Sequence, residues 1–158
     1  MLKPEIKIGN STVILPFAIK DIDGVVIDME SFLECDHDGI DALYVRLDLE
    51  GSRWLTAGVT LDNRDKDLPV EDKTIIGILL LHDTEFCGIR LHDSKWTDVC
   101  ELVGQPDHVK YGNLLAPLEN GYYFDCLQNF DDGMVSQMEV YTLFDNAERV
   151  DRDLAKYK

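Results

Sequence analysis

The sequence predicts an α+β fold of mostly antiparallel strands, with one well-defined helix at about residues 94–103 and a short helix near the C-terminus. Three observations support this prediction. Short runs of alternating apolar and polar residues recur along the chain, and Gly-, Asn- and Asp-containing turns separate them. One segment shows the 3.6-residue apolar period of an amphipathic helix. Hydrophobic residues make up 45% of the 158 residues, which is enough to build a core.

The first half of the chain is predicted to consist of strands and turns. Gly9-Asn10 and Asp23-Gly24 each lie between short apolar runs, as the turns of hairpins do. The expected elements are, in order, a hairpin of residues 5–8 and 11–15, a second hairpin within 19–29, a loop at 36–39, strands at 43–49 and 54–61, and a solvated loop at 62–72.

The second half is predicted to contain two hairpins on either side of a helix. Residues 75–81 form a continuous apolar run, which is typical of a strand buried on both faces. After a turn at 82–85, residues 86–91 are expected to return as its antiparallel partner. Residues 122–130 and 134–144 form the second predicted hairpin, around Asp131-Asp132-Gly133.

The helix at 94–103 has recognisable start and stop signals. Asp93 or Ser94 can accept hydrogen bonds from the free amides of the first turn. Gly104 can adopt the left-handed closing conformation, and Pro106 prevents continuation. Its apolar face comprises Trp96, Val99, Cys100 and Val103. A short last helix is expected after Asn146, with an apolar stripe of Val150, Leu154 and Tyr157.

No linker divides the chain, so residues 1–158 are expected to form one domain. A division into two lobes remains open, with an acidic β-rich lobe at 1–72 and a hairpin, helix and hairpin at 73–158. The N-terminal sequence does not resemble a secretory signal, and no apolar run approaches the length of a membrane-spanning helix. The sequence therefore predicts a cytoplasmic protein with reduced cysteines.

The charge of the chain narrows its possible partners. Thirty-one Asp and Glu stand against fifteen Lys and Arg, for a net charge of −16. Residues 21–50 alone hold ten acidic residues and a single basic residue, Arg46. Such a field repels nucleic acid and anionic lipid and attracts cationic partners. We therefore expect a basic protein partner, no nucleic acid and no membrane.

Metal and catalytic sites are weakly indicated. Asp21, Asp23 and Glu30 occupy three ligand positions of a degenerate calcium loop, but Ile19 stands at its first position. A second acidic loop, which begins at Glu34, lacks the final bidentate ligand.

The histidines and cysteines are weaker candidates still. His82 and His92 are expected at opposite ends of a strand pair, too far apart to share zinc. Cys35 lies between Glu34 and Asp36, and the two acids should raise the pKa of its thiol and disfavour a nucleophilic thiolate. We therefore expect no catalytic residue, metal or cofactor.

Residues 87–141 resemble the small outer-membrane lipoprotein module of the SmpA/OmlA type. In that module a strand leads into a short helix that ends in GxP, and a hairpin packs against the helix. The matching segments are Gly88-Ile89-Arg90-Leu91, Asp93-Ser94-Lys95-Trp96-Thr97-Asp98-Val99, Leu102-Val103-Gly104-Gln105-Pro106, Tyr122-Tyr123-Phe124 and Asp132-Gly133-Met134-Val135. The chain lacks the lipid-accepting Cys near its start, so the resemblance implies an architecture for protein binding and not an envelope function. In size and charge the chain is also similar to bacterial immunity proteins that neutralise toxins.

These observations favour a non-enzymatic protein that binds and occludes a basic bacterial toxin, for example a nuclease. The expected contact surface comprises Glu34, Asp36, Asp38 and Asp41, with Tyr44 or Trp54 as an apolar anchor. The alternative is an assembly module of SmpA/OmlA-like architecture that binds another protein through a sheet edge or through the Trp96 helix. A third interpretation is that the acidic residues only confer solubility.

Overall fold

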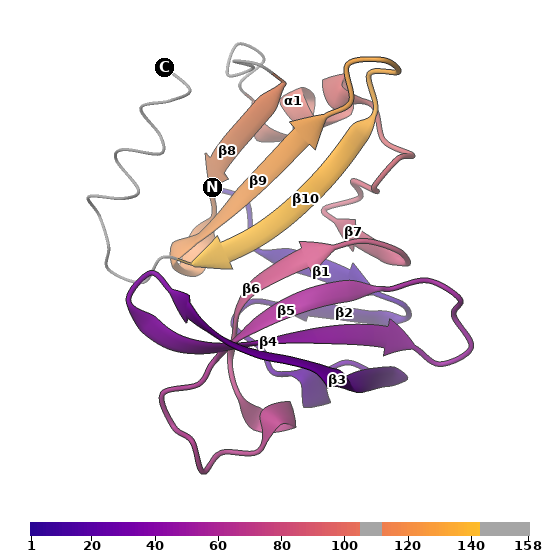
Figure 1. Ribbon diagram of the computed structural model, residues 1–158. Helices are drawn as coiled ribbons and strands as arrows, with labels where there is room; N and C mark the ends of the chain where they lie inside the picture. Colours follow the sequence, from indigo (N-terminus) through magenta and orange to yellow (C-terminus); the bar gives the residue numbers. More distant parts are fainter. Residues whose placement is uncertain (105–111, 143–158) are drawn as a thin grey trace.

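The computed structural model describes residues 1–104 and 112–142, and in this part of the chain it places two antiparallel sheets and one α-helix (Figure 1). The predicted α+β class is confirmed. The strands are β1 (Glu5–Ile8), β2 (Ser11–Ile14), β3 (Val25–His37), β4 (Ile40–Leu49), β5 (Ala57–Asp62), β6 (Ile75–Leu80), β7 (Thr84–Phe86), β8 (Asn113–Pro117), β9 (Tyr122–Gln128) and β10 (Val135–Thr142). The helix is α1 (Trp96–Val103), and the 3-10 turns are η1 (Ile19–Asp21), η2 (Val70–Asp72) and η3 (Glu119–Gly121).

The larger sheet has seven strands in the order β3-β4-β5-β6-β10-β9-β8, and each neighbouring pair is antiparallel. β6 occupies its centre, which explains the continuous apolar run at residues 75–80. The sheet contains strands from both of the lobes considered above, and β5 and β6, on either side of residue 72, are neighbours.

The core lies on one face of the large sheet, between it, the smaller sheet β2-β1-β7 and α1 (Figure 1). Alternate residues of β4, namely Leu43, Val45 and Leu47, point into this core. Phe86 of β7 stacks on Phe124 of β9, with 4.2 Å between ring centroids. Aromatic packing thus joins the two sheets.

The predicted hairpin within residues 19–29 is wrong. Residues 19–21 form the turn η1, in which the Asp21 carboxylate accepts a hydrogen bond of 2.9 Å from the Ala18 amide. The strand that follows, β3, is thirteen residues long and runs through most of the acidic segment. Its turn into β4 is Asp38-Gly39, with φ values of 56° and 84°, as a two-residue hairpin turn requires.

The predicted pairing of residues 75–81 with 86–91 is also wrong. β7 pairs with β1, with Ile6 opposite Phe86 and Ile8 opposite Thr84. Both edges of β6 are already occupied, by β5 and by β10. The chain after β6 therefore crosses to the smaller sheet instead of folding back.

The predicted helix is confirmed, but its expected N-cap is wrong. The cap residue is Lys95, and the Asp98 carboxylate reaches back to accept a 3.0 Å hydrogen bond from the Lys95 amide. The Ser94 hydroxyl instead accepts from the amide of Arg90, at 2.9 Å. Gly104 closes the helix at φ 68°, as expected. The predicted C-terminal helix lies outside the described residues.

Candidate protein-binding surface

The acidic segment at residues 21–50 folds into one unit, and its central part is the β3–β4 hairpin at residues 25–49, here called the acidic hairpin. The hairpin forms one edge of the large sheet, because β3 has β4 as its only strand neighbour among the described residues (Figure 1). Seven of the ten acidic residues of segment 21–50 therefore lie on one hairpin at the edge of the sheet.

Two hydrogen bonds hold the tip of the acidic hairpin. The Asp36 carboxylate accepts a 2.7 Å bond from the Gly39 amide and closes the turn. Nε2 of His37 lies 2.7 Å from the carbonyl oxygen of Thr142, at the end of β10. Because a carbonyl can only accept, Nε2 is the donor. The twist of the sheet thus brings the tip to β10, although β5 and β6 separate β4 from β10 in strand order (Figure 1).

Within the described residues, Lys and Arg do little to neutralise Glu34, Asp36 and Asp41 near the tip. Lys66 Nζ lies 3.9 Å from Asp41 Oδ2, at the outer limit of an ion pair. Glu34 and Asp36 are exposed, and no Lys or Arg of the described part lies within 4 Å of their carboxylates. Asp38 is half-buried in the turn. Glu34 and Asp36 therefore present negative charge to solvent.

The strand register divides the predicted contact residues between the two faces of the sheet. Residues directly opposite each other in an antiparallel pair share a face. Asp36 is opposite Asp41 and Glu34 is opposite Leu43, so these acids share one face. Tyr44 is opposite Leu33 and points to the other face. Tyr44 is therefore not an anchor beside Glu34, Asp36 and Asp41.

Tyr44 packs within the sheet. Its ring leans diagonally across to Gly58 in β5, where an added Cβ atom would overlap the Tyr44 hydroxyl. Tyr44 is half-buried as a result. An aromatic side chain that covers a strand glycine stabilises the sheet locally, and that is the contact the structure gives Tyr44.

Trp54 lies at the other end of the acidic hairpin. It belongs to the β4–β5 connection, and its ring centroid is 5.5 Å from that of His82. β4 has ten residues, which at about 3.3 Å per residue places its ends about 30 Å apart. Trp54 is 64% exposed, but it does not share a surface with the tip.

β3 also carries exposed apolar side chains, which were not predicted from the sequence. Of the eight large exposed hydrophobic residues in the described part, three lie on this strand: Val26, Met29 and Leu33. Leu33 is 61% exposed and directly precedes Glu34 in the chain. Recognising Asp38-Gly39 as a hairpin turn would have revealed a strand that combines exposed apolar and acidic residues.

The described residues contain no group of three or more His, Cys, Asp and Glu side chains that could hold a metal ion. Asp21, Asp23 and Glu30 do not form such a group, and the Asp21 carboxylate bonds to its own turn. Burial is the largest cause that raises the pKa of the Cys35 thiol, and the negative charge of Asp36 adds to it. Both effects favour the thiol over the thiolate.

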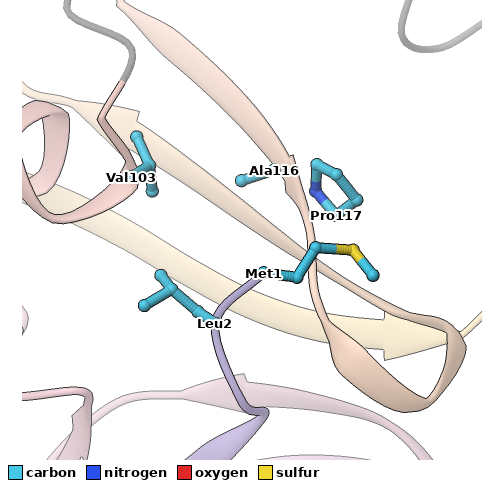
Figure 2. A pocket seen from close by; sticks show the side chains of 5 residues that line it. All are labelled: Met1, Leu2, Val103, Ala116 and Pro117. Atoms are coloured by element: carbon cyan, nitrogen blue, oxygen red, sulfur yellow. The ribbon is translucent and has the colours of Figure 1, made fainter.

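Two pockets in the described part are small. A pocket of 230 Å³ lies between the N-terminus, the end of α1 and β8. Figure 2 shows the described side chains that line it, which are all apolar: Met1, Leu2, Val103, Ala116 and Pro117. A pocket of 210 Å³ is lined by residues that include Lys7, Glu85 and Arg90. Arg90 and Glu85 are paired there at 2.8 Å. Neither described lining brings a histidine to a carboxylate.

No protein-family model matches this chain, and no curated protein or solved structure matches it either. Among the described residues, no helix has the length and apolarity needed to cross a membrane.

Proposed function

We propose that this protein is a non-enzymatic, cytoplasmic immunity protein that binds a basic toxin through the acidic hairpin. The observation that carries the proposal is the pair of exposed carboxylates at Glu34 and Asp36, which lie at a sheet edge with no Lys or Arg of the described part within 4 Å. They lie on one element with further acids, so a partner that binds there meets several negative charges at once.

Three acidic side chains outside the acidic hairpin are each paired with Lys or Arg in the described part. Asp62 bonds to Arg64 at 2.6 Å, Asp72 to Lys20 at 3.2 Å and Glu85 to Arg90 at 2.8 Å. The hydrogen bonds from Arg64 lower the pKa of Asp62 and keep its carboxylate charged. Because uncompensated carboxylates repel one another, a cationic partner at the acidic hairpin would relieve repulsion as well as gain attraction.

A nuclease fits this surface by its chemistry. A protein that cleaves nucleic acid holds phosphates with Lys and Arg, and these groups also attract carboxylates. The acidic hairpin would then occupy the phosphate site and exclude the substrate. Attraction between opposite charges would speed the encounter and make it strongly dependent on salt.

The alternative proposal is an assembly module of SmpA/OmlA-like architecture that binds through a helix face or a sheet edge. In the described residues only the sheet edge is open to a partner. Trp96 and Val99 are buried in the core, so the apolar face of α1 is not available to a partner. A sheet edge remains available at β3. An assembly module that binds there through apolar contacts alone would bind with little dependence on salt.

The proposal is tested by co-purification of the tagged protein from its host at about 0.05 M and about 0.5 M salt. We expect a basic protein to co-elute at low salt, and its toxic activity to be inhibited by the purified chain. The double variant Glu34→Gln/Asp36→Asn should bind this partner at least about tenfold more weakly, because both negative charges are gone. The Asn side chain at position 36 can still accept the hydrogen bond that closes the turn, so the hairpin itself should be retained.

A matched control removes the same charge elsewhere. Asp67→Asn/Glu71→Gln changes two exposed acids of the β5–β6 connection and should retain the partner. The proposal fails if the two double variants retain the partner equally, or if the specific partner proves neutral or acidic.

A further inference from the structure

We propose that the partner adds a strand to the open edge of β3 at residues 33–37, through a segment in which cationic and apolar residues alternate. This inference rests on the proposed function and states how the partner would be held. It depends on three features of β3: the direction of its backbone groups, the faces of its side chains, and its charge.

The backbone groups of Glu34 and Asp36 point away from β4. In β4 the Arg46 amide points toward β3, where the Ser31 hydroxyl accepts it at 2.8 Å. The Asp41 carbonyl points the other way and accepts from Asn63, in the chain after β5, at 3.0 Å. Backbone direction alternates along a strand, so even-numbered residues of β4 face β3 and odd-numbered residues face β5.

Glu34 and Asp36 are opposite the odd-numbered residues Leu43 and Asp41. Their own amide and carbonyl groups therefore point outward, to an edge with no strand beside it in the described part. Unpaired groups of this kind are the template to which an extended segment adds.

The side chains of residues 33–37 specify the chemistry of the added strand. Glu34 and Asp36 lie on one face, and Leu33 lies on the other. Residues opposite each other across a new strand pair would again share a face. The partner would thus place Lys or Arg against Glu34 and Asp36, and an apolar residue against Leu33, which is the alternation proposed.

A second copy of this chain is a poor occupant of the edge. β3 contains no Lys or Arg, so pairing it with itself would set carboxylates against carboxylates. The net charge of −16 adds repulsion between copies.

The edge of β3 is also regular enough to accept a strand. β3 lacks proline, which often protects edge strands, and only the shift in register between Asp28 and Leu33 interrupts its edge. The regular open edge is therefore the arm at residues 33–37.

A capped peptide of about eight residues in which Lys alternates with Val is a suitable probe. Its control has the same composition with the Lys and Val residues segregated, so the two peptides differ in pattern and not in charge. We expect the alternating peptide to bind about tenfold more tightly and to slow amide hydrogen exchange at Glu34 and Asp36 in the intact chain.

Two substitutions at one position separate backbone pairing from charge. Glu34→Gln and Glu34→Pro both remove the carboxylate, but only proline removes the outward amide, which an edge strand tolerates. We expect proline to weaken binding of the alternating peptide about tenfold more than glutamine does, at an unchanged unfolding midpoint. If the proline variant does not fold, the exchange measurement on the unsubstituted chain decides.

The outcomes separate the two proposals. Equal affinity for both peptides, with no protection of Glu34 and Asp36, overturns strand addition but leaves binding to the acidic hairpin intact. Failure of both peptides to bind at low salt overturns both proposals. Tighter binding of the alternating peptide, with slowed exchange at these two amides, supports strand addition.

Discussion

Tyr122, at the start of β9, is 4% exposed, and its hydroxyl donates a 2.9 Å hydrogen bond to the carbonyl oxygen of Ile75 in β6. β10 lies between these strands, so this bond joins two elements that the sheet ladder does not pair. We expect Tyr122→Phe to lower the free energy of unfolding by about 1–2 kcal/mol, because the Ile75 carbonyl loses its side-chain donor in a buried site. Urea unfolding at pH 7 measures this, with Tyr44→Phe as the control; equal losses would contradict it.

The same side chain predicts a change of stability at alkaline pH. Burial raises the pKa of Tyr122 to about 12, while the unfolded chain releases this proton near pH 10. The folded state thus binds the proton more tightly, and the stability that this gives is complete below pH 10 and lost as the pH rises toward 12. At 1.36 kcal/mol per pH unit the loss reaches about 2–3 kcal/mol.

Tyr122→Phe has no proton to lose, so we expect its deficit in stability to shrink above pH 10 and then to reverse. Urea unfolding of both proteins from pH 9 upward measures the difference. A deficit that stays constant over this range would show that the buried hydroxyl does not titrate as the structure implies.

At the scale of the element, the parts that were predicted correctly are those whose partners are close in sequence. Gly9 turns β1 into β2, Asp131-Asp132-Gly133 turns β9 into β10, and α1 is specified by its own apolar face. The pairing of β7 with β1 was missed because it joins residues about eighty positions apart, and no local pattern encodes it. β8 was missed for a similar reason, since it is short and lies at the far edge of the sheet.

The candidate site shows the same division. Composition alone identified the acidic segment at residues 21–50, because charge density is a property of the sequence. The face of each side chain depends on register, which the length of β3 and the Asp38-Gly39 turn determine. Tyr44 and Trp54 were therefore grouped with acids whose surface they do not share, and Leu33 was overlooked.

The contact between Tyr44 and Gly58 gives a prediction about the packing of β4 on β5. Gly58→Ala should lower the free energy of unfolding by about 1–3 kcal/mol, because the new methyl group overlaps the Tyr44 ring. Gly77→Ala is the matched control in β6, where an added Cβ meets its nearest neighbours at ordinary distances of 3.5 Å and beyond. In a double-mutant cycle, Gly58→Ala should cost much less stability in the Tyr44→Ala background, where no ring is left to overlap the new methyl group. Additive effects in that cycle, or equal losses at both glycines, would contradict this role for Tyr44.

At the scale of the whole molecule, the charge has opposite consequences for folding and for binding. The net charge of −16 makes the compact state repel itself, and the acidic hairpin concentrates part of that repulsion at one sheet edge. A cationic partner would convert this unfavourable energy into attraction. Stability of the free chain and affinity for the partner should therefore respond to ionic strength in opposite directions.

We expect urea unfolding to show a rise in stability between about 0.02 M and about 0.5 M NaCl, because salt screens repulsion among the carboxylates. Over the same range the affinity for the Lys-Val peptide should fall, because salt also screens attraction. Urea is uncharged, so it leaves the ionic strength under separate control. In Glu34→Gln/Asp36→Asn both responses should be weaker, whereas Asp67→Asn/Glu71→Gln should weaken only the response of stability. If the peptide affinity of the two double variants depends equally on salt, the attraction comes from the total charge of the chain and not from its acidic hairpin.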